Sequence, residues 1–168
     1  NYAEVVEAVE RLLDGESVSR FSSIDLPEEE TGRVLTTPEH YAYIKIAEGC
    51  DNRCSYCIIP YLRGKFRSRQ MDDILYEARL LAANGVKELI VVAQDTSRYG
   101  TDFPEHKRLL AELLRNLCKI DGIEWIRIHY LYPDEIDDEL IRTIAEEPKI
   151  VKYLDLPIQH CNTKILKL

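Results

Sequence analysis

Three cysteines lie close together near the end of the first third of the chain. Cys50, Cys54 and Cys57 follow one another at the spacing Cys-x3-Cys-x2-Cys within the segment EGCDNRCSYC. Three thiolates can bind three irons of a four-iron cubane cluster, which leaves the fourth iron open to a ligand from outside the protein. A chelating amino acid group is the ligand that suits such an iron. The spacing therefore predicts an iron–sulfur cluster with one open iron.

Two other interpretations of these cysteines remain open from the residues alone. A zinc ion held by the three thiolates and a histidine, His40 or His160, would only stiffen the loop, although no histidine follows at the usual zinc-ligand spacing. Unliganded buried cysteines are disfavoured by polar neighbours such as Asp51 and Arg53. Of the two further cysteines, Cys118 continues the apolar face of a predicted helix and is expected in the core, and Cys161 is assigned no role.

The composition is that of a soluble globular protein of about one domain. The 168 residues are 45% hydrophobic and 31% charged, and the net charge of −8 argues against coating nucleic acid through bulk electrostatics. No apolar run approaches the roughly 18 residues of a membrane span, and the N-terminus lacks the features of a secretory signal. An odd number of cysteines, three of them clustered, favours a metal site in a reducing compartment. We therefore expect a cytoplasmic protein without membrane contact.

The first forty residues are expected to be a helix and a linker that follow a preceding domain. Residues 3–13 place apolar side chains at helical spacing, and Gly15 is positioned to end the helix. Residues 16–40 carry Pro27, Pro38 and a run of acidic residues without a sustained period, which is typical of a linker. We place a domain boundary near Tyr41.

From Tyr41 onward, strand and helix patterns alternate as in parallel βα units. We predict strands over Tyr41–Glu48, Val86–Ala93, Glu124–Tyr130 and Lys152–Ile158, and helices over Gln70–Ala83, from Pro104 to Lys119, over Pro133–Glu146 and after a capping Asn162. Four such repeats predict an α/β fold: a partial (β/α) barrel of parallel strands over residues 41–168, incomplete at its C-terminus. The sequence is thus expected to be a fragment of a longer chain.

With Tyr56 before the last cysteine, the cysteine spacing resembles the signature of the radical S-adenosylmethionine superfamily. Residues 33–168 look like its methylthiotransferase family in the stretches YAYIKIAEGCDNRCSYCIIPYLRGKFRSR, LIVVAQDTSRYGTD, IRIHYLYP and YLDLPIQH. The turn Gln94-Asp95-Thr96 and the HYLYP segment are more similar to ribosomal-protein aspartate methylthiotransferases than to relatives that modify transfer RNA.

The resemblance implies a reductive cleavage of S-adenosylmethionine, after which a 5'-deoxyadenosyl radical removes hydrogen from the β-carbon of an aspartate in a small-subunit ribosomal protein. It also implies a second four-iron cluster as the sulfur source, bound by three cysteines upstream of Asn1 that Cys118 and Cys161 cannot replace. Residues 1–168 alone are then expected to cleave the cofactor without completing methylthiolation. Transfer-RNA methylthiolation and a non-catalytic, zinc-stabilised module that binds ribosome or RNA are the alternatives.

Functional groups of a parallel barrel gather at the carboxyl ends of its strands. The cysteines follow the first strand, the Gln94–Arg98 segment follows the second and Gln159-His160 follows the fourth, so we expect all three at one site. Alternation along the third strand directs Arg127 and His129 into the lumen if their isoleucine neighbours face outward, and the same alternation applies to Lys45 and Asp155. For each of these four side chains, the alternative is exposure to solvent in a barrel that is incomplete.

The expected contacts to the adenosyl cofactor are five residues: Tyr56, Gln94, Asp95, Arg127 and His129. None needs to act as an acid or a base in a radical reaction.

A stripe of cations lies within residues 53–69, which contain no glutamate and no aspartate. Arg63, Lys65, Arg67 and Arg69 are candidates for contact with ribosomal RNA phosphates, and the alternative is a solvated loop or one that balances the charge of the cluster. The expected remaining partner is a reductase that donates the electron.

Overall fold

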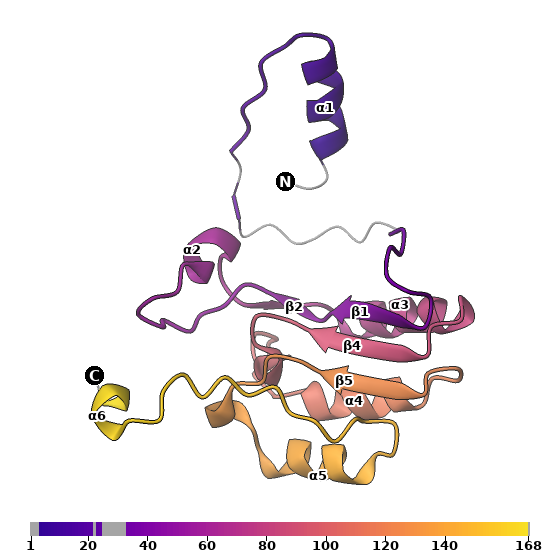
Figure 1. Ribbon diagram of the computed structural model, residues 1–168, viewed down its shortest axis with the longest axis vertical. Coiled ribbons are helices and arrows are strands. Elements are labelled where there is room, and N and C mark those ends of the chain that lie inside the picture. Colours follow the sequence, from indigo (N-terminus) through magenta and orange to yellow (C-terminus); the bar gives the residue numbers. More distant parts are fainter. Residues whose placement is uncertain (1–3, 22, 25–32, 168) are drawn as a thin grey trace. The chain divides into compact units, whose positions relative to one another are not determined.

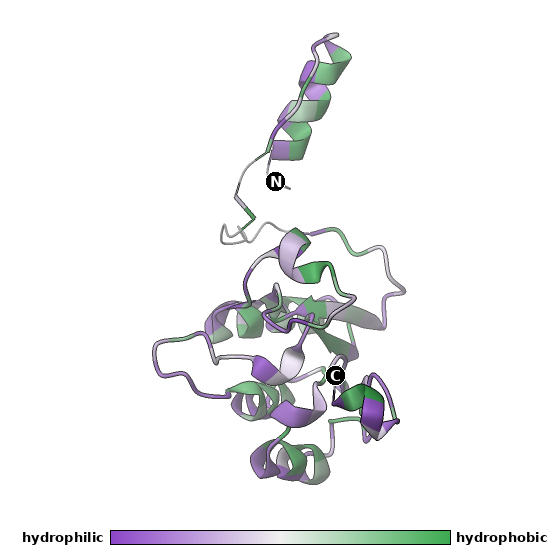
Figure 2. Cartoon of the chain, turned by 90° about the vertical axis from the view of Figure 1, so that its left-hand side faces the viewer, coloured by the Kyte–Doolittle hydropathy of each residue, from purple (hydrophilic) through white to green (hydrophobic). Residues whose placement is uncertain are grey.

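The computed structural model describes residues 4–21, 23–24 and 33–167, and the chain divides into two compact units, residues 1–34 and 35–168. In the first unit, helix α1 (Val5–Leu13) confirms the predicted helix over its described part. Apolar residues lie along one side of α1 (Figure 2) and remain exposed. Arg20 returns to pair with Glu7 on the helix, and the predicted linker residue Pro27 lies outside the described residues.

The second unit is built on a three-stranded parallel sheet in the order β1-β4-β5 (Figure 1). Its strands are β1 (Tyr41–Lys45), β4 (Glu88–Val92) and β5 (Trp125–Ile128). Helix α3 (Met71–Ala83) lies in the connection from β1 to β4, α4 (Leu110–Cys118) joins β4 to β5, and α5 (Asp138–Glu146) follows β5. The alternation of strand and helix confirms the predicted α/β fold.

All three helices pack on one face of the sheet. The sheet contributes buried side chains such as Ile44, Leu89 and Ile126, and the same core cluster contains α3, α4 and α5 residues. Helices confined to one face are typical of a barrel wall, whereas a doubly wound sheet carries helices on both faces. Residues of opposite parity, Arg127 among them, lie on the other face, which confirms the predicted alternation.

The predicted first strand is interrupted at Ile46. Ile46 donates its N–H to Val92 and accepts from Arg69 through its carbonyl, so the chain leaves the parallel sheet there. The next two residues form β2 (Ala47–Glu48), which pairs antiparallel with β3 (Arg67–Ser68). Between β2 and β3 the short helix α2 (Ile59–Arg63), which the sequence patterns did not predict, ends at Gly64.

The prediction that a helix starts at Pro104 is wrong. Residues 101–109 form turns, and α4 begins only at Leu110. His106 has a φ of 48°, outside the helical region, and Leu109 donates its N–H to the carbonyl of Tyr99, which closes the loop before the helix.

The predicted strand over 152–158 is also wrong, since residues 151–160 are irregular. Ile150 forms one parallel bridge to Ile126, but Tyr153 then bonds back to Val151, and this tight turn takes the chain out of the ladder. The segment stays beside the end of β5, because Leu131 donates its N–H to the carbonyl of Asp155.

The predicted third helix divides into a 3-10 turn, η3 (Pro133–Glu135), and α5. Asp137 causes the division, because its carboxylate caps α5 by accepting from the N–H of Leu140 at 2.8 Å. Asn162 caps α6 (Thr163–Leu166) as predicted. Among the described residues no helix is both long and apolar enough to span a membrane.

Candidate functional site

The cysteine loop, defined as residues 49–66, lies beyond the carboxyl ends of the strands. Figure 1 shows α2 and the rest of this loop on the side to which the arrow of β1 points. The segment after β4, including the 3-10 turn η2 (Thr96–Arg98), leaves the sheet at the same edge, as do residues 129–132 after β5. The structure therefore brings the cysteine loop and the segment after β4 together, as the sequence predicted, and the segment after β5 leaves the sheet at the same end.

Gly49 allows the first residues of the cysteine loop to lie against its last residues, Gly64 and Lys65. Its φ is +80°, and a Cβ there would overlap the carbonyl oxygen of Lys65 and lie 2.7 Å from that of Gly64. The next residue, Cys50, donates its N–H to that same Gly64 carbonyl at 3.2 Å, and the N–H of Phe66 bonds to the side chain of Asp51. Glycine is therefore required by both conformation and space.

Two side chains of the cysteine loop are anchored to the segment after β4. Asn52 donates through Nδ2 to the carboxylate of Asp95 at 3.0 Å, and Asp51 lies 3.8 Å from the guanidinium of Arg98. That guanidinium also stacks over the ring of Phe66 at 5.3 Å from its centroid. The first half of the loop is thus held by contacts outside the loop itself.

The three thiols differ in exposure. Cys50 is buried, and burial raises the pKa of its thiol, with the N–H of Asn52 opposing and the charge of Asp95 reinforcing that direction. Cys54 and Cys57 are partly exposed, and the N–H of Cys57 bonds to the carbonyl of Cys54 in a tight turn. Cys118 packs against the core as predicted, and burial raises the pKa of its thiol to about 11.

Three thiols on one partly open loop are a donor set that fits an iron–sulfur cluster. Within the described part of the chain, no three His, Cys, Asp or Glu side chains converge closely enough to hold a single metal ion. A cubane assigns each cysteine to a different iron, whereas zinc draws all its ligands onto one atom.

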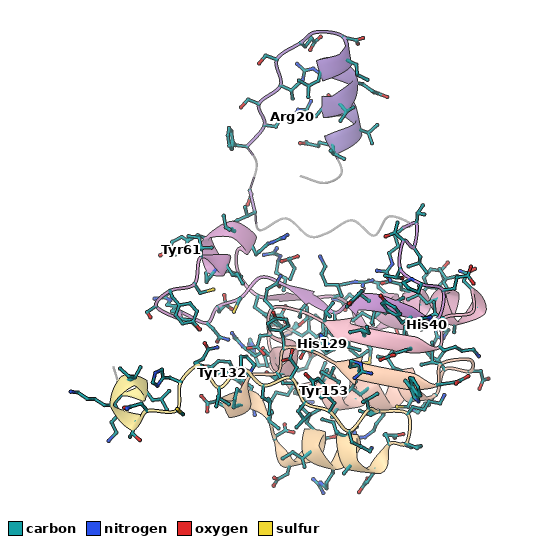
Figure 3. The ribbon with its side chains drawn as sticks, in the orientation of Figure 1. Arg20, His40, Tyr61, His129, Tyr132 and Tyr153 are labelled. Carbon is teal, nitrogen blue, oxygen red and sulfur yellow. The ribbon has the colours of Figure 1, made fainter. Side chains whose placement is uncertain are left out.

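The two candidate zinc histidines occupy different places. His40 precedes β1 and lies at the opposite end of the sheet from the cysteine loop (Figure 3), so it does not belong to this site. His160 lies beyond the end of β5 and accepts from the N–H of Asn162 through its ring.

Glu48, which the sequence patterns did not identify, is a buried acid immediately before the cysteine loop. It accepts from Lys45 at 2.9 Å, from Gln94 at 2.9 Å and from the N–H of Gly49. Burial alone would raise the pKa of this carboxyl, but the Lys45 hydrogen bond and charge, with Gly49 and Arg63, hold it below its ordinary value. Its position as the last residue of a predicted strand, directly before a glycine, was the available signal.

The side-chain amide of Gln94 forms a hydrogen bond to a described residue through its nitrogen but not through its oxygen. Its Nε2 donates to Glu48, while its Oε1 is buried and accepts no hydrogen bond from any described residue. A buried acceptor without a donor is costly in a protein interior. The atom is therefore suited to accept from a bound ligand.

Aromatic side chains border the thiols. Tyr56 is exposed, and its hydroxyl donates to the side chain of Gln159, a residue with a φ of 62°. Burial raises the pKa of Tyr132, and the charges of Cys54, Asp134 and Asp95 act in the same direction. The sequence patterns did not single out Tyr132.

Arg127 and His129 occupy different positions along the strand direction, on the face of the sheet opposite α3, α4 and α5. The guanidinium of Arg127 pairs with Glu88 at 2.7 Å, and it lies 6.0 Å from the ring centroid of Tyr153. Glu88 is the first residue of β4, so this pair lies away from Gln94 and Asp95, which follow that strand. His129 comes directly after β5, nearer the thiols.

The chain is similar to proteins whose activity is named. Two curated relatives are each named ribosomal protein uS12 methylthiotransferase RimO. The chain is 50% identical to that of Caldanaerobacter subterraneus subsp. tengcongensis and 52% identical to that of Lachnoclostridium phytofermentans. Each match covers 99% of this chain and 38% of the relative's length. The enzyme of the same name from Acetivibrio thermocellus is 60% identical over 136 residues, which are 81% of this chain and 30% of that protein.

A solved structure shares the fold. The radical S-adenosylmethionine methyltransferase TsrM from Kitasatospora setae, bound to tryptophan and a cofactor analogue, matches with a TM-score of 0.59 at 18% identity, over 76% of this chain and 24% of that one. In a second structure, which contains cobalamin and a [4Fe-4S] cluster, TsrM matches with the same TM-score. Residues 44–168 also match the family model of the Radical SAM superfamily. The chain, with its three-cysteine loop at the carboxyl edge of a parallel sheet, therefore belongs to the radical SAM superfamily.

Proposed function

We propose that this chain is the S-adenosylmethionine-cleaving part of an enzyme that methylthiolates the β-carbon of an aspartate in ribosomal protein uS12. The observation that carries the proposal is the loop with Cys50, Cys54 and Cys57, in a chain 50% and 60% identical to two enzymes named as ribosomal protein uS12 methylthiotransferases. The relatives are much longer than this chain, so the remaining steps require residues outside it.

In the proposed mechanism, the three thiolates hold the cluster and the protein fixes the loop that carries them. Cys50, Cys54 and Cys57 would hold a four-iron cluster, and such a cluster would supply the electron needed for reductive cleavage of S-adenosylmethionine. Gly49 and the anchors at Asp51 and Asn52 maintain the loop's path. The unpartnered Oε1 of Gln94 is suited to accept a hydrogen bond from the bound cofactor.

The remaining predicted contacts orient the cofactor and the substrate. His129 follows β5 at the end of the sheet where the cysteine loop lies, and Tyr56 belongs to that loop, so we assign both to the cofactor. Arg127 remains a proposed contact too, although its ion pair with Glu88 directs it toward the start of β4. Asp95 has both carboxylate oxygens engaged by protein groups, so its contribution to cofactor binding is the placement of the loop.

The finer parts of the proposal concern partners outside this chain. We propose that a second four-iron cluster, held by the longer protein, supplies sulfur, that a reductase supplies electrons and that the reaction takes place in the cytoplasm. The proposed contact with ribosomal RNA involves Arg63 and Lys65, which are exposed, and Arg67. Arg69 is less suited to it, because it pairs with Glu77 at 2.8 Å.

The test compares two substrates and two lengths of protein. The full-length protein that contains this chain is incubated anaerobically with S-adenosylmethionine, reductant and either ribosomal protein uS12 in the small subunit or transfer RNA. We expect a methylthio group on a uS12 aspartate, and a Cys54→Ala variant should form none. Modification of transfer RNA alone, or sulfur insertion by residues 1–168 alone, would contradict the proposal.

A further inference from the structure

A buried carboxylate connects the three loops around the thiols. Asp95 is 2% exposed and accepts from Asn52 in the cysteine loop and from the hydroxyl of Ser97. The Ser97 oxygen, itself buried, accepts the backbone N–H of Tyr132 at 3.0 Å, in the segment after β5. We call Asn52, Asp95, Ser97 and Tyr132 the Asp95 network. It joins segments that follow β1, β4 and β5.

The charge of Asp95 is not balanced within the network. Both hydrogen-bond donors to its carboxylate are neutral, and among the described residues no lysine, arginine or histidine forms an ion pair with it. The other buried acid of the site, Glu48, is by contrast paired with Lys45. Burying a carboxylate without a cation is costly, and hydrogen bonds offset only part of that cost. An asparagine could accept from Asn52 through its oxygen and donate its amide N–H to the Ser97 oxygen, so both partners could be held without burying a charge.

We propose that Asp95 is a positioning residue that fixes the cysteine loop through Asn52, and that its unbalanced charge lowers the reduction potential of the cluster bound by Cys50, Cys54 and Cys57. A fixed negative charge in a low-dielectric interior opposes the addition of an electron nearby. A lower potential makes the reduced cluster a stronger electron donor. This inference rests on the proposed function, because it takes the three thiols to hold a cluster.

Two substitutions of Asp95 separate position from charge. Asp95→Asn retains the size of the side chain, can still accept from Asn52 and can donate to the Ser97 oxygen in place of accepting from its hydroxyl, but it removes the charge. Asp95→Ala removes the hydrogen bonds as well. Hydrogen exchange of the metal-free 168-residue chain reports on position, and the midpoint potential of the cluster-loaded chain, followed by its visible absorbance, reports on charge.

We expect Asp95→Ala to accelerate amide exchange in residues 51–57 by about tenfold and Asp95→Asn to accelerate it by less than about threefold. Asp95→Asn should nevertheless shift the midpoint potential to a more positive value. Ser97→Ala, which breaks the connection to Tyr132 and keeps the charge, should accelerate exchange without a positive shift. This variant keeps the position test available if Asp95→Ala does not fold.

Asp121→Asn is the matched control, because Asp121 is an exposed carboxylate that precedes β5 at the opposite edge of the sheet. If Asp95→Asn and Asp121→Asn had the same midpoint potential, the charge of Asp95 would not affect the cluster. If amide exchange in residues 51–57 were unchanged in both Asp95→Ala and Ser97→Ala, Asp95 would not position the cysteine loop. A wild-type chain that takes up no iron would instead refute the proposed function together with the charge assignment. The exchange measurement on the metal-free chain would still decide the positioning role.

Discussion

Replacing Gly49 by alanine should displace the cysteine loop and reduce iron binding. A non-glycine residue in the left-handed region costs about 1–2 kcal/mol. The added Cβ would also overlap the carbonyl of Lys65 and come within 2.7 Å of that of Gly64. These are backbone atoms that cannot rotate away, and the Gly64 carbonyl accepts the N–H of Cys50. Forcing an atom into such a packed place adds about 1–3 kcal/mol, for a total of roughly 2–5 kcal/mol.

Gly85→Ala provides the matched control, because the φ of Gly85 is +93° and nothing lies within 4 Å of a Cβ built there. It incurs the conformational cost without the overlap. At about 2–4 °C per kcal/mol for a domain of this size, Gly85→Ala should lower Tm by roughly 2–8 °C, and Gly49→Ala by up to about 20 °C if the whole unit bears the strain.

Iron content after anaerobic reconstitution distinguishes a strained loop from a strained domain. We expect Gly85→Ala to bind as much iron per chain as the wild type, and Gly49→Ala to bind clearly less, because the displaced loop no longer presents its thiols together. If Gly49→Ala matched Gly85→Ala in both Tm and iron content, the close fit between residues 49 and 64–65 would not determine the path of the loop.

Three further outcomes follow from individual side chains. The pKa of Glu48 is lowered, so the stability that its pairing with Lys45 provides is present above the ordinary value of 4.5 and is lost as pH falls through the lower, folded value. The free energy of unfolding of Glu48→Gln should therefore be about 1–2 kcal/mol below that of the wild type at neutral pH. Denaturant titrations should show that this difference disappears in acid, and a difference independent of pH would contradict the pairing. Iodoacetamide at pH 8 should label exposed Cys161 well before Cys118, whose thiol pKa is about 11, and mass spectrometry showing equal rates would refute the burial of Cys118. His129→Ala should lower the rate of S-adenosylmethionine cleavage by about tenfold at unchanged iron content, whereas complete loss would mean that His129 does more than orient the cofactor.

The sequence predicted what depends on local spacing and on alternation. The three cysteines fall within a segment of eight residues, so their shared loop follows from chain connectivity. The alternation along β5 placed Ile126 in the core and Arg127 on the opposite face, as the structure confirms. The cap at Asn162 was likewise recognised from a local preference.

What the sequence did not predict depends on partners distant in the chain. The break at Ile46 arises because β2 pairs with β3, some twenty residues later, and no pattern within 41–48 records that partner. The segment after Lys152 has the composition of a strand, but the turn at Tyr153 removes it from the ladder. Asp95 was predicted as a cofactor contact, and only the structure shows that Asn52 and Ser97 occupy its oxygens.

The most direct test of the central claim is electron paramagnetic resonance of the reduced, iron-loaded chain with and without S-adenosylmethionine, combined with metal analysis. We expect about four irons per chain, a spectrum that changes when the cofactor is added and release of 5'-deoxyadenosine with methionine. Substituting any one of Cys50, Cys54 and Cys57 by alanine should abolish all three. A colourless protein with one zinc per chain, or a cluster whose spectrum is unchanged by S-adenosylmethionine, would contradict the proposal that the three thiols hold a cluster with an open iron.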